Sequence, residues 1–248
     1  MDFKGLDIVS IRDFSVEQIE AIMALSEEMV PVARGEKRSR ALDGKILSTL
    51  FFEPSTRTRM SFESAMMRLG GRCLDMGSVS YSSVSKGETL ADTIRMMESY
   101  SDAIVLRHPQ EGAARLAARF SGKPVINAGD GAGQHPTQTL LDLFTIRRAK
   151  KKLDGIKVAL IGDLKYGRTV HSLAEALTMF GADLSFVAPQ SLQMPKETIK
   201  QVEKMGGKPK VRSKVEEVIK DIDVLYVTRI QKERFPDMAE YQKVAGTY

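Results

Sequence analysis

Short apolar runs alternate with amphipathic stretches along most of this chain. Residues 44–52 and 156–161 are near-continuous apolar runs typical of buried strands, and a stretch with helical periodicity follows each one. The order of strand and helix recurs as far as residue 227 and restarts after 153–155. Near-continuous apolar strands that alternate with helices indicate parallel sheets. We therefore predict an α/β fold of two domains, each a parallel sheet with helices on both faces.

Individual elements follow from local signals. Ser15 begins a helix expected over 15–34, and Gln18 stands three residues later, as in a capping box. Further helices are expected at 58–69, 88–100, 112–120, 136–152, 169–180, 195–205 and 213–219. Strands are expected at 44–52, from residue 72, and at 103–106, 124–126, 156–161, 184–187, 208–211 and 224–227. We place the first domain at 1–135, an interdomain helix at 136–152 and the second domain at 153–248.

Composition excludes several classes of protein. The 248 residues are 42% apolar and 28% charged with a net charge of +5, which rules out a disordered or fibrous chain. The single cysteine, Cys73, excludes an intrachain disulfide, and we interpret it as a small apolar residue. The N-terminus lacks a signal-peptide pattern, and no apolar run reaches the roughly 18 residues of a membrane span. We expect a soluble cytoplasmic protein that binds neither membrane nor nucleic acid, because its basic residues alternate with acids.

Hydroxyl and cationic side chains gather directly after the strand expected at 44–52. The segment Glu53-Pro54-Ser55-Thr56-Arg57-Thr58-Arg59 surrounds the start of the next helix. Free backbone N–H groups and the helix dipole favour negative charge there, and arginine binds phosphate with two hydrogen bonds. A simple N-cap needs fewer such residues, so we expect an anion pocket. Arg107 adds a cation after the strand at 103–106.

A Gly-rich loop expected over 127–133 leads into the helix at 136–152. His135 and Gln138 stand at the mouth of that helix, and a histidine there can donate a hydrogen bond to an oxygen that becomes negative in a transition state. The glycines do not form the dinucleotide fingerprint, so no nucleotide cofactor is expected. The three histidines lack metal-ligand spacing, so we expect no metal.

Two arginines in the second half follow expected strands in the same way. Arg168 ends the segment GDLKYGR after 156–161, and Arg229 follows 224–227. Both are candidate ligands for a carboxylate. With phosphate chemistry in one half and carboxylate chemistry in the other, the residues indicate transfer between a phosphate-bearing donor and an acidic acceptor.

The sequence resembles the catalytic subunits of the aspartate carbamoyltransferase family over essentially all 248 residues. The resemblance lies in FFEPSTRTRMSFE, KGETLADT, RHPQEGAARL, NAGDGAGQHPTQTLLDLFTI, GDLKYGRTVHSL and TRIQKERF. It implies an N-terminal carbamoyl-phosphate domain and a C-terminal aspartate domain. The implied reaction moves the carbamoyl group to the α-amine of L-aspartate, in pyrimidine biosynthesis, without metal or cofactor.

The resemblance also implies roles for individual residues. The phosphate would be held by Ser55, Thr56, Arg57, Thr58 and Arg107. The carbonyl oxygen would be polarised by Thr58, Arg107 and His135, and the amino group contacted by Gln138. The carboxylates of aspartate would be held by Arg168, Arg229 and Gln231. Ser82 and Lys86, to which the residues alone assign no role, match side chains that this family lends to a neighbouring subunit's site.

Family members commonly form catalytic homotrimers with shared active sites, and some also bind zinc-bearing regulatory subunits. They continue past the last residue of this chain with a segment that lines the active site and a final helix. A second interpretation therefore stays open, that of a catalytically weak, truncated subunit that binds carbamoyl phosphate or serves assembly. A third is ornithine carbamoyltransferase, which shares the phosphate motif. Arg229 favours aspartate, because a cation there would repel the cationic side chain of ornithine.

Overall fold

The computed structural model of the chain describes residues 3–78 and 82–229. The chain divides into two compact units, residues 1–140 and 141–248. Each unit contains a four-stranded sheet in its described part, and every pairing between neighbouring strands is parallel. This arrangement confirms the predicted α/β class.

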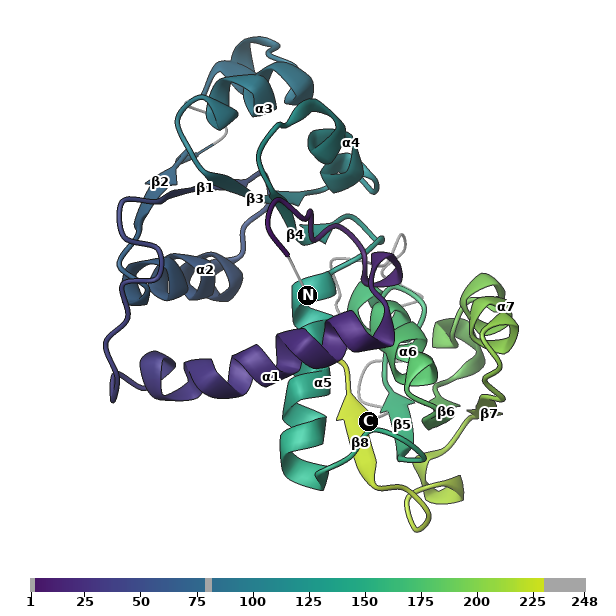
Figure 1. Ribbon diagram of the computed structural model, residues 1–248. Coiled ribbons are helices and arrows are strands. Elements are labelled where there is room, and N and C mark those ends of the chain that lie inside the picture. The colour runs from purple at the N-terminus through teal and green to yellow at the C-terminus, as the bar shows by residue number, and fades with distance from the viewer. Residues whose placement is uncertain (1–2, 79–81, 230–248) are drawn as a thin grey trace. The chain divides into compact units, whose positions relative to one another are not determined.

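The first unit is built on a sheet with strand order β2-β1-β3-β4. Its strands are β1 (Ile46–Phe51), β2 (Arg72–Asp75), β3 (Ala103–His108) and β4 (Val125–Asp130). Its helices are α1 (Val16–Ala33), α2 (Thr56–Arg68), α3 (Leu90–Glu98) and α4 (Ala113–Phe120), with 3-10 helices η1 (Ile11–Asp13) and η3 (Ser83–Lys86). In Figure 1, α3 and α4 lie over one face of this sheet and α2 over the other.

Two apolar clusters hold these layers together. On one face, Leu50 and Leu106 pack against Ile94 of α3 and the alanines of α4. On the other face, Leu47 and Val105 pack against Met66 of α2. The alternation of faces along β1 and β3 follows from the two-residue repeat of a strand.

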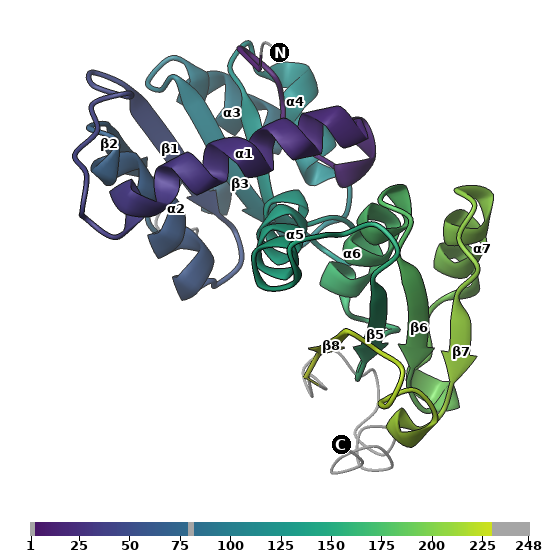
Figure 2. The same cartoon turned by 60° about the horizontal axis from the view of Figure 1, so that its bottom comes forward.

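The second unit contains a sheet with strand order β7-β6-β5-β8. Its strands are β5 (Lys157–Ile161), β6 (Asp183–Val187), β7 (Lys210–Arg212) and β8 (Val224–Val227). Helix α5 (Pro136–Lys150) runs into this unit, followed by α6 (Arg168–Met179), η4 (Gln190–Leu192), α7 (Lys196–Lys204) and η5 (Val215–Glu217). Figure 2 shows α6 and α7 beside the strands β5, β6 and β7.

Several predicted elements are confirmed and some need correction. The capping box at Ser15 is present, since Ser15 Oγ accepts from Gln18 N–H and the Gln18 side chain accepts from Ser15 N–H. The Gly-rich segment is not all loop, because β4 continues to Asp130 with Asn127 paired to β3. The helix expected at 213–219 is only the 3-10 helix η5.

The chain reverses its direction of travel across each sheet. In the first unit it leaves β1 for β2 on one side and then returns to β3 on the other. In the second unit it passes from β5 to β6 and β7 and then returns to β8, beside β5. Ligands in open parallel sheets bind at the carboxyl ends of the strands where such a reversal occurs. The topology therefore marks one position in each sheet, between β1 and β3 and between β5 and β8.

Candidate functional site

The turn from β1 into α2 lies at the reversal of the first sheet. Ser55 is the N-cap residue of α2, yet its side chain makes no capping hydrogen bond. Arg57 is exposed, and no hydrogen bond or ion pair joins its side chain to any described residue. Arg59 is engaged, because Nη1 lies 3.1 Å from Asp75 Oδ2 and Nε lies 3.7 Å from Glu63 Oε1. The two arginines of the segment are thus in different states, and Arg57 is the one available to a ligand.

The charge at this helix start opposes the helix dipole. The first turn of α2 carries no acidic residue and does carry Arg57. The positive end of a helix favours anions, so a cation there is unfavourable unless an anion accompanies it. Thr56 and Arg57 are exposed and Ser55 and Thr58 are half-buried, so their hydroxyl and guanidinium groups lie at the accessible end of the helix. This arrangement fits a phosphate group.

Arg107 lies next to this turn at the end of β3. Residues Phe51 and Arg107 are register partners, and Arg107 C=O accepts a hydrogen bond from Phe52 N–H at 2.9 Å. Its guanidinium donates from Nη1 to the carbonyl of Ala128 at 3.0 Å, and its Nε lies 3.4 Å from Glu53 Oε2. Contacts from β4 and from the turn after β1 therefore fix the orientation of this side chain.

His108 follows Arg107 and faces an apolar neighbour. Its ring centroid lies 4.8 Å from that of Phe52, and its Nδ1 accepts a hydrogen bond from Gln110 N–H at 3.0 Å. Burial holds the pKa of His108 below its usual value, against the raising effect of Glu53 and Asp130. The ring is therefore mostly neutral at pH 7, and it supports the end of β3 rather than adding positive charge.

His135 and Gln138 begin helix α5, which follows the strand next to β3. His135 is only 6% exposed, and its Nδ1 lies 3.4 Å from the Thr137 hydroxyl. Its carbonyl accepts the backbone N–H groups of Gln138 and Thr139 and so starts the helix. Neighbouring parallel strands lie about 4.8 Å apart, so the ends of β1, β3 and β4 present these segments side by side.

Ser82 and Lys86 belong to η3 and its N-cap. Ser82 is half-buried and its carbonyl accepts hydrogen bonds from Ser85, while Lys86 is exposed. Their assignment to a neighbouring subunit's site remains a prediction.

In the second unit, Arg168 and Arg229 follow neighbouring strands, β5 and β8. Thr228 N–H donates to Ile161 C=O at 2.8 Å, and its hydroxyl donates to Asp163 C=O at 3.3 Å. Arg168 is 5% exposed and Arg229 is exposed. Gly162 has a φ of +112°, and a Cβ there would collide with the Thr228 carbonyl, so the close approach requires glycine. Gln231 lies outside the described residues.

A polar cluster supports the same end of this sheet. The Tyr226 hydroxyl donates to Asp142 Oδ2 of α5 at 3.0 Å. Burial, together with the Asp142 carboxylate, raises the pKa of Tyr226 well above its usual value, so the hydroxyl stays protonated. The bond holds β8 against α5 two residues before Thr228.

Two organising residues have no role in the predictions from sequence. Asp130 and Asn127 are buried and join the loop before His135 to the rest of the first unit. A local signal was present, since Asn127 Oδ1 accepts Gly129 N–H in the Asx turn that such a spacing favours. Their other partners are distant in the sequence, and no local pattern reveals them.

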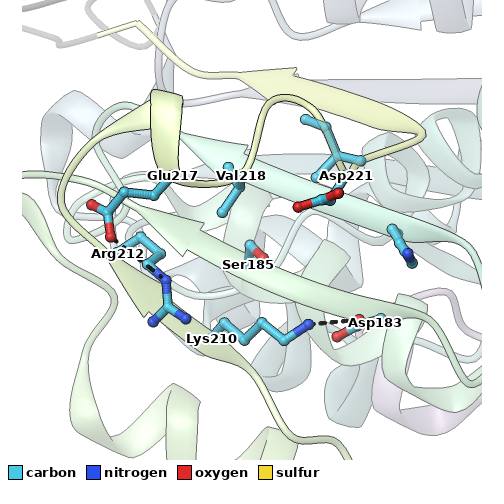
Figure 3. Close-up of a pocket in the computed structure, with 9 residues that line it drawn as sticks. Asp183, Ser185, Lys210, Arg212, Glu217, Val218 and Asp221 are labelled. Atoms are coloured by element: carbon cyan, nitrogen blue, oxygen red, sulfur yellow. Dashed lines mark hydrogen bonds and ion pairs between the residues drawn. The ribbon is translucent and has the colours of Figure 1, made fainter.

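A cavity of about 310 Å³ lies elsewhere in the second unit. It involves Lys157, Asp183 and Lys210, which are the first residues of their strands, and so lies toward the opposite ends from Arg168 and Arg229. Figure 3 shows two ion pairs at this cavity, Lys210 with Asp183 at 2.9 Å and Arg212 with Glu217 at 3.7 Å. Four of its charged side chains are paired with one another in this way, and we assign no ligand to it.

Within residues 3–78 and 82–229, no group of three or more acidic, histidine or cysteine side chains could hold a metal ion. Among the helices described, none combines the length and apolar character that crossing a membrane requires.

Comparisons with known proteins show the family to which the chain belongs. The family described as "Aspartate/ornithine carbamoyltransferase, carbamoyl-P binding domain" matches residues 6–148, and "Aspartate/ornithine carbamoyltransferase, Asp/Orn binding domain" matches residues 154–248. The aspartate carbamoyltransferase catalytic subunit of Methanosarcina mazei is 58% identical over 98% of this chain and 79% of its own length. That of Thermococcus kodakarensis is 57% identical over 100% of this chain and 80% of its own.

Solved structures give the same result. The catalytic subunit of "M. Jannaschii" aspartate transcarbamoylase superposes with a TM-score of 0.89 at 52% identity, covering 98% of this chain and 79% of that one. Aspartate transcarbamoylase from Trypanosoma cruzi, in complex with carbamoyl phosphate and aspartate, gives 0.91 at 44% identity over 98% and 78%. Sequence and structure agree along both units, and the chain therefore belongs to the aspartate/ornithine carbamoyltransferase family.

Proposed function

We propose that this chain transfers the carbamoyl group of carbamoyl phosphate to the α-amine of L-aspartate, giving N-carbamoyl-L-aspartate and phosphate. The observation that carries the proposal is the start of α2, where Arg57 has no partner among the described residues and Ser55 leaves the helix uncapped, beside Arg107. An unfavourable cation at the positive end of a helix is explained by an anionic ligand. The names of the relatives support carbamoyl phosphate as that anion.

The phosphate of the donor would bind Ser55, Thr56, Arg57, Thr58 and Arg107. Thr58, Arg107 and His135 would donate hydrogen bonds to the carbonyl oxygen, and Gln138 would contact the amino group. The amine of aspartate attacks the carbonyl carbon, and the carbonyl oxygen becomes negative in a tetrahedral intermediate. The bond between that carbon and the phosphate oxygen then breaks, and phosphate leaves with the proton that the amine releases. Each donor aimed at that oxygen can supply about 2.7–4 kcal/mol of transition-state stabilisation.

The acceptor would bind through its carboxylates to Arg168, Arg229 and Gln231. Exposure of Arg229 directly after β8 supports an anionic acceptor over ornithine, because a cationic side chain would be repelled there. We expect the reaction to need no metal or cofactor. Attack by the amine, stabilisation of the negative oxygen and loss of phosphate need only hydrogen-bond donors and correct positioning of the two substrates.

The proposal also covers the oligomeric state, the pathway and the cellular location of the enzyme. The active form would be a homotrimer in which Ser82 and Lys86 complete the site of a neighbouring copy. Exposure of Lys86 on η3 supports a role outside its own unit. The product would feed pyrimidine biosynthesis in the cytoplasm, and a zinc-bearing regulatory subunit is a further partner to seek by mass measurement.

The test is formation of N-carbamoyl-L-aspartate from carbamoyl phosphate and L-aspartate, with ornithine in parallel and the mass of the oligomer recorded. Turnover with aspartate alone by a trimer is the expected result. Binding of carbamoyl phosphate without turnover would instead support the interpretation as a weak binding or assembly subunit. Turnover with ornithine would overturn the assignment of Arg229.

A further inference from the structure

Asp130 is a buried carboxylate at the end of β4, outside the residues assigned to substrates. It is 5% exposed and accepts three hydrogen bonds. These come from Gly112 N–H at 2.8 Å, Asn127 Nδ2 at 3.0 Å and Gln134 N–H at 2.9 Å. A buried charge is costly unless hydrogen bonds satisfy it, so the carboxylate fixes each of these donors in place.

Asn127, which is fully buried, completes the network. Its Nδ2 donates to Val9 C=O at 3.0 Å and to Gln134 C=O at 3.3 Å, in addition to Asp130. Its Oδ1 accepts from Gly129 N–H at 2.8 Å, which closes a turn around Ala128. Backbone groups that a buried side-chain network satisfies are held in one arrangement, because a broken bond leaves an unpaired polar group.

Two backbone positions that this network fixes, Ala128 and Gln134, adjoin candidate site residues. Gln134 is bonded at its N–H by Asp130 and at its carbonyl by Asn127, and the next residue is His135. The carbonyl of Ala128, inside the Asn127 turn, accepts the hydrogen bond from Arg107 Nη1. The same pair of side chains thus controls both Arg107 and His135.

The glycines of this segment serve its packing. A Cβ on Gly131 would lie 2.7 Å from the Pro109 carbonyl, and one on Gly133 would lie 2.9 Å from Glu111. The segment therefore packs closely against residues 109–111, and this packing holds Asp130 within reach of Gly112.

We propose that Asn127 and Asp130 are positioning residues that jointly hold Arg107 and His135 in the geometry needed for reaction. The proposal rests on the proposed function, in which both donors meet the carbonyl oxygen of carbamoyl phosphate. Donors for a developing negative charge act only if they are oriented before the reaction. A displacement of about 1 Å can lower the rate by roughly 100-fold.

The test compares Asp130→Asn with a matched control, Asp102→Asn. In Asp130→Asn, one carboxylate oxygen is replaced by an NH2 group. That group faces N–H donors and cannot accept their hydrogen bonds. Asp102 precedes β3 at the opposite end of the same sheet, where it accepts from Ile46 N–H at 2.9 Å and pairs with Lys45 Nζ at 2.9 Å. Both changes remove a carboxylate that anchors backbone, but only Asp130 adjoins the candidate site.

Two readouts separate positioning from stability. We expect Asp130→Asn to lower kcat by about 10- to 100-fold with less than about threefold change in KM for aspartate, because the loss falls on the transition state. Asp102→Asn is expected to keep kcat within about twofold of the unmodified chain. In NMR spectra of ¹⁵N-histidine-labelled protein, the ring signals of His135 should move in Asp130→Asn and stay in Asp102→Asn.

A second variant guards against failure of Asp130→Asn to fold. Asn127→Ser keeps a hydroxyl that can accept Gly129 N–H but loses the Nδ2 bonds to Val9, Asp130 and Gln134. It should therefore move the His135 signals while disturbing Arg107 less, because the turn around Ala128 is retained. The positioning role is overturned if Asp130→Asn and Asn127→Ser both leave kcat and the His135 signals where Asp102→Asn leaves them. If the unmodified chain forms no carbamoyl-aspartate, the proposed function fails, and the His135 signals alone then decide the positioning role.

Discussion

Helices α1 and α2 both begin after a serine, and they use that serine differently. At α1, Ser15 Oγ accepts a hydrogen bond from Gln18 N–H at 3.3 Å, and Gln18 Oε1 accepts one from Ser15 N–H at 2.8 Å. Glu17 adds a negative charge to the first turn. At α2, Ser55 makes no capping bond and the first turn carries Arg57 instead of an acid. The start of α1 is therefore stabilised by its own residues, whereas the start of α2 lacks both the serine cap and the acidic residue.

The difference distinguishes a structural helix start from one suited to a ligand. A free N-terminal turn and an unfavourable cation lower the stability of the unliganded chain. A bound phosphate would satisfy both, because it accepts hydrogen bonds and carries negative charge. If α1 has a structural start and α2 a ligand-binding start, substitutions at the two helix starts should differ in their effects on activity and on stability.

The largest effect is expected from Arg57→Ala. The variant should lose about 10²- to 10³-fold in kcat/KM for carbamoyl transfer, because it removes a charged donor at the phosphate. Arg59→Ala should lose less than tenfold, since Arg59 is already paired with Asp75 and Glu63. Steady-state formation of carbamoyl-aspartate measures both, and equal losses would contradict the distinction between the two arginines.

Phosphate should stabilise the chain through α2. At a concentration 100 times its dissociation constant, binding adds about 2.7 kcal/mol to the free energy of unfolding. Thermal melts with and without phosphate measure the gain, which should shrink as salt screens the charges. Ser15→Ala should retain the shift and Arg57→Ala should lose it. A shift that survives in Arg57→Ala would place the anion elsewhere.

The two serines should respond in opposite ways to alanine. Ser15→Ala removes a working cap and should lower the free energy of unfolding by about 1 kcal/mol while leaving activity unchanged. Ser55→Ala should change stability by less than about 0.5 kcal/mol. It should instead weaken phosphate binding about tenfold, because it removes a hydrogen bond to a charged group. Thermal denaturation measures the stability of both variants, and phosphate titration measures their affinity for phosphate. A larger loss of stability in Ser55→Ala, or a larger loss of phosphate affinity in Ser15→Ala, would refute the distinction between the two helix starts.

The smallest effect concerns the pH dependence of α1. The Ser15 hydroxyl, which donates to the Glu17 carboxylate, and the backbone hold the pKa of Glu17 below its usual 4.5. A lowered pKa in the folded state gives stability that is present above pH 4.5 and is lost as pH falls through the folded value. Glu17→Gln should therefore lower the free energy of unfolding slightly at pH 7, leave it nearly unchanged below the folded pKa of Glu17, and so flatten the stability profile between these pH values. Denaturant unfolding measured from acid pH to pH 7 checks this, and an equal change at every pH would show that Glu17 acts other than through its charge.

Local features of the fold were predictable because their causes lie within a few residues. The cap at Ser15 depends on Gln18, and β8 depends on the apolar run at 224–227; both are confirmed. The helix expected at 213–219 was wrong in type. The Glu217 carboxylate accepts Ser213 and Lys214 N–H groups, and these bonds accompany a short 3-10 helix in place of a regular α-helix.

The site was predictable only in its chemistry. Residues at strand ends were identified because arginine, hydroxyl and histidine side chains cluster there in the sequence, and their substrate roles stay predictions. The helix expected at 136–152 is present as Pro136–Lys150, and its role as the boundary between two domains stays a prediction. The network around Asp130 was missed, because it joins Asn127 to Val9 across 118 positions and Asp130 to Gly112 across 18.

The amino-acid sequence was sufficient to predict the alternation of strands and helices, the capped start of α1 and the residues that could meet an anion. These depend on side-chain periodicity and on hydrogen bonds between near neighbours. The tertiary structure was needed to show that β1 lies beside β3 and β5 beside β8, and that Asp130 anchors the backbone before His135. It also showed that Arg59 is paired, whereas Arg57 has no partner among residues 3–78 and 82–229. Those outcomes depend on contacts between distant parts of the chain, and packing of the whole unit selects them.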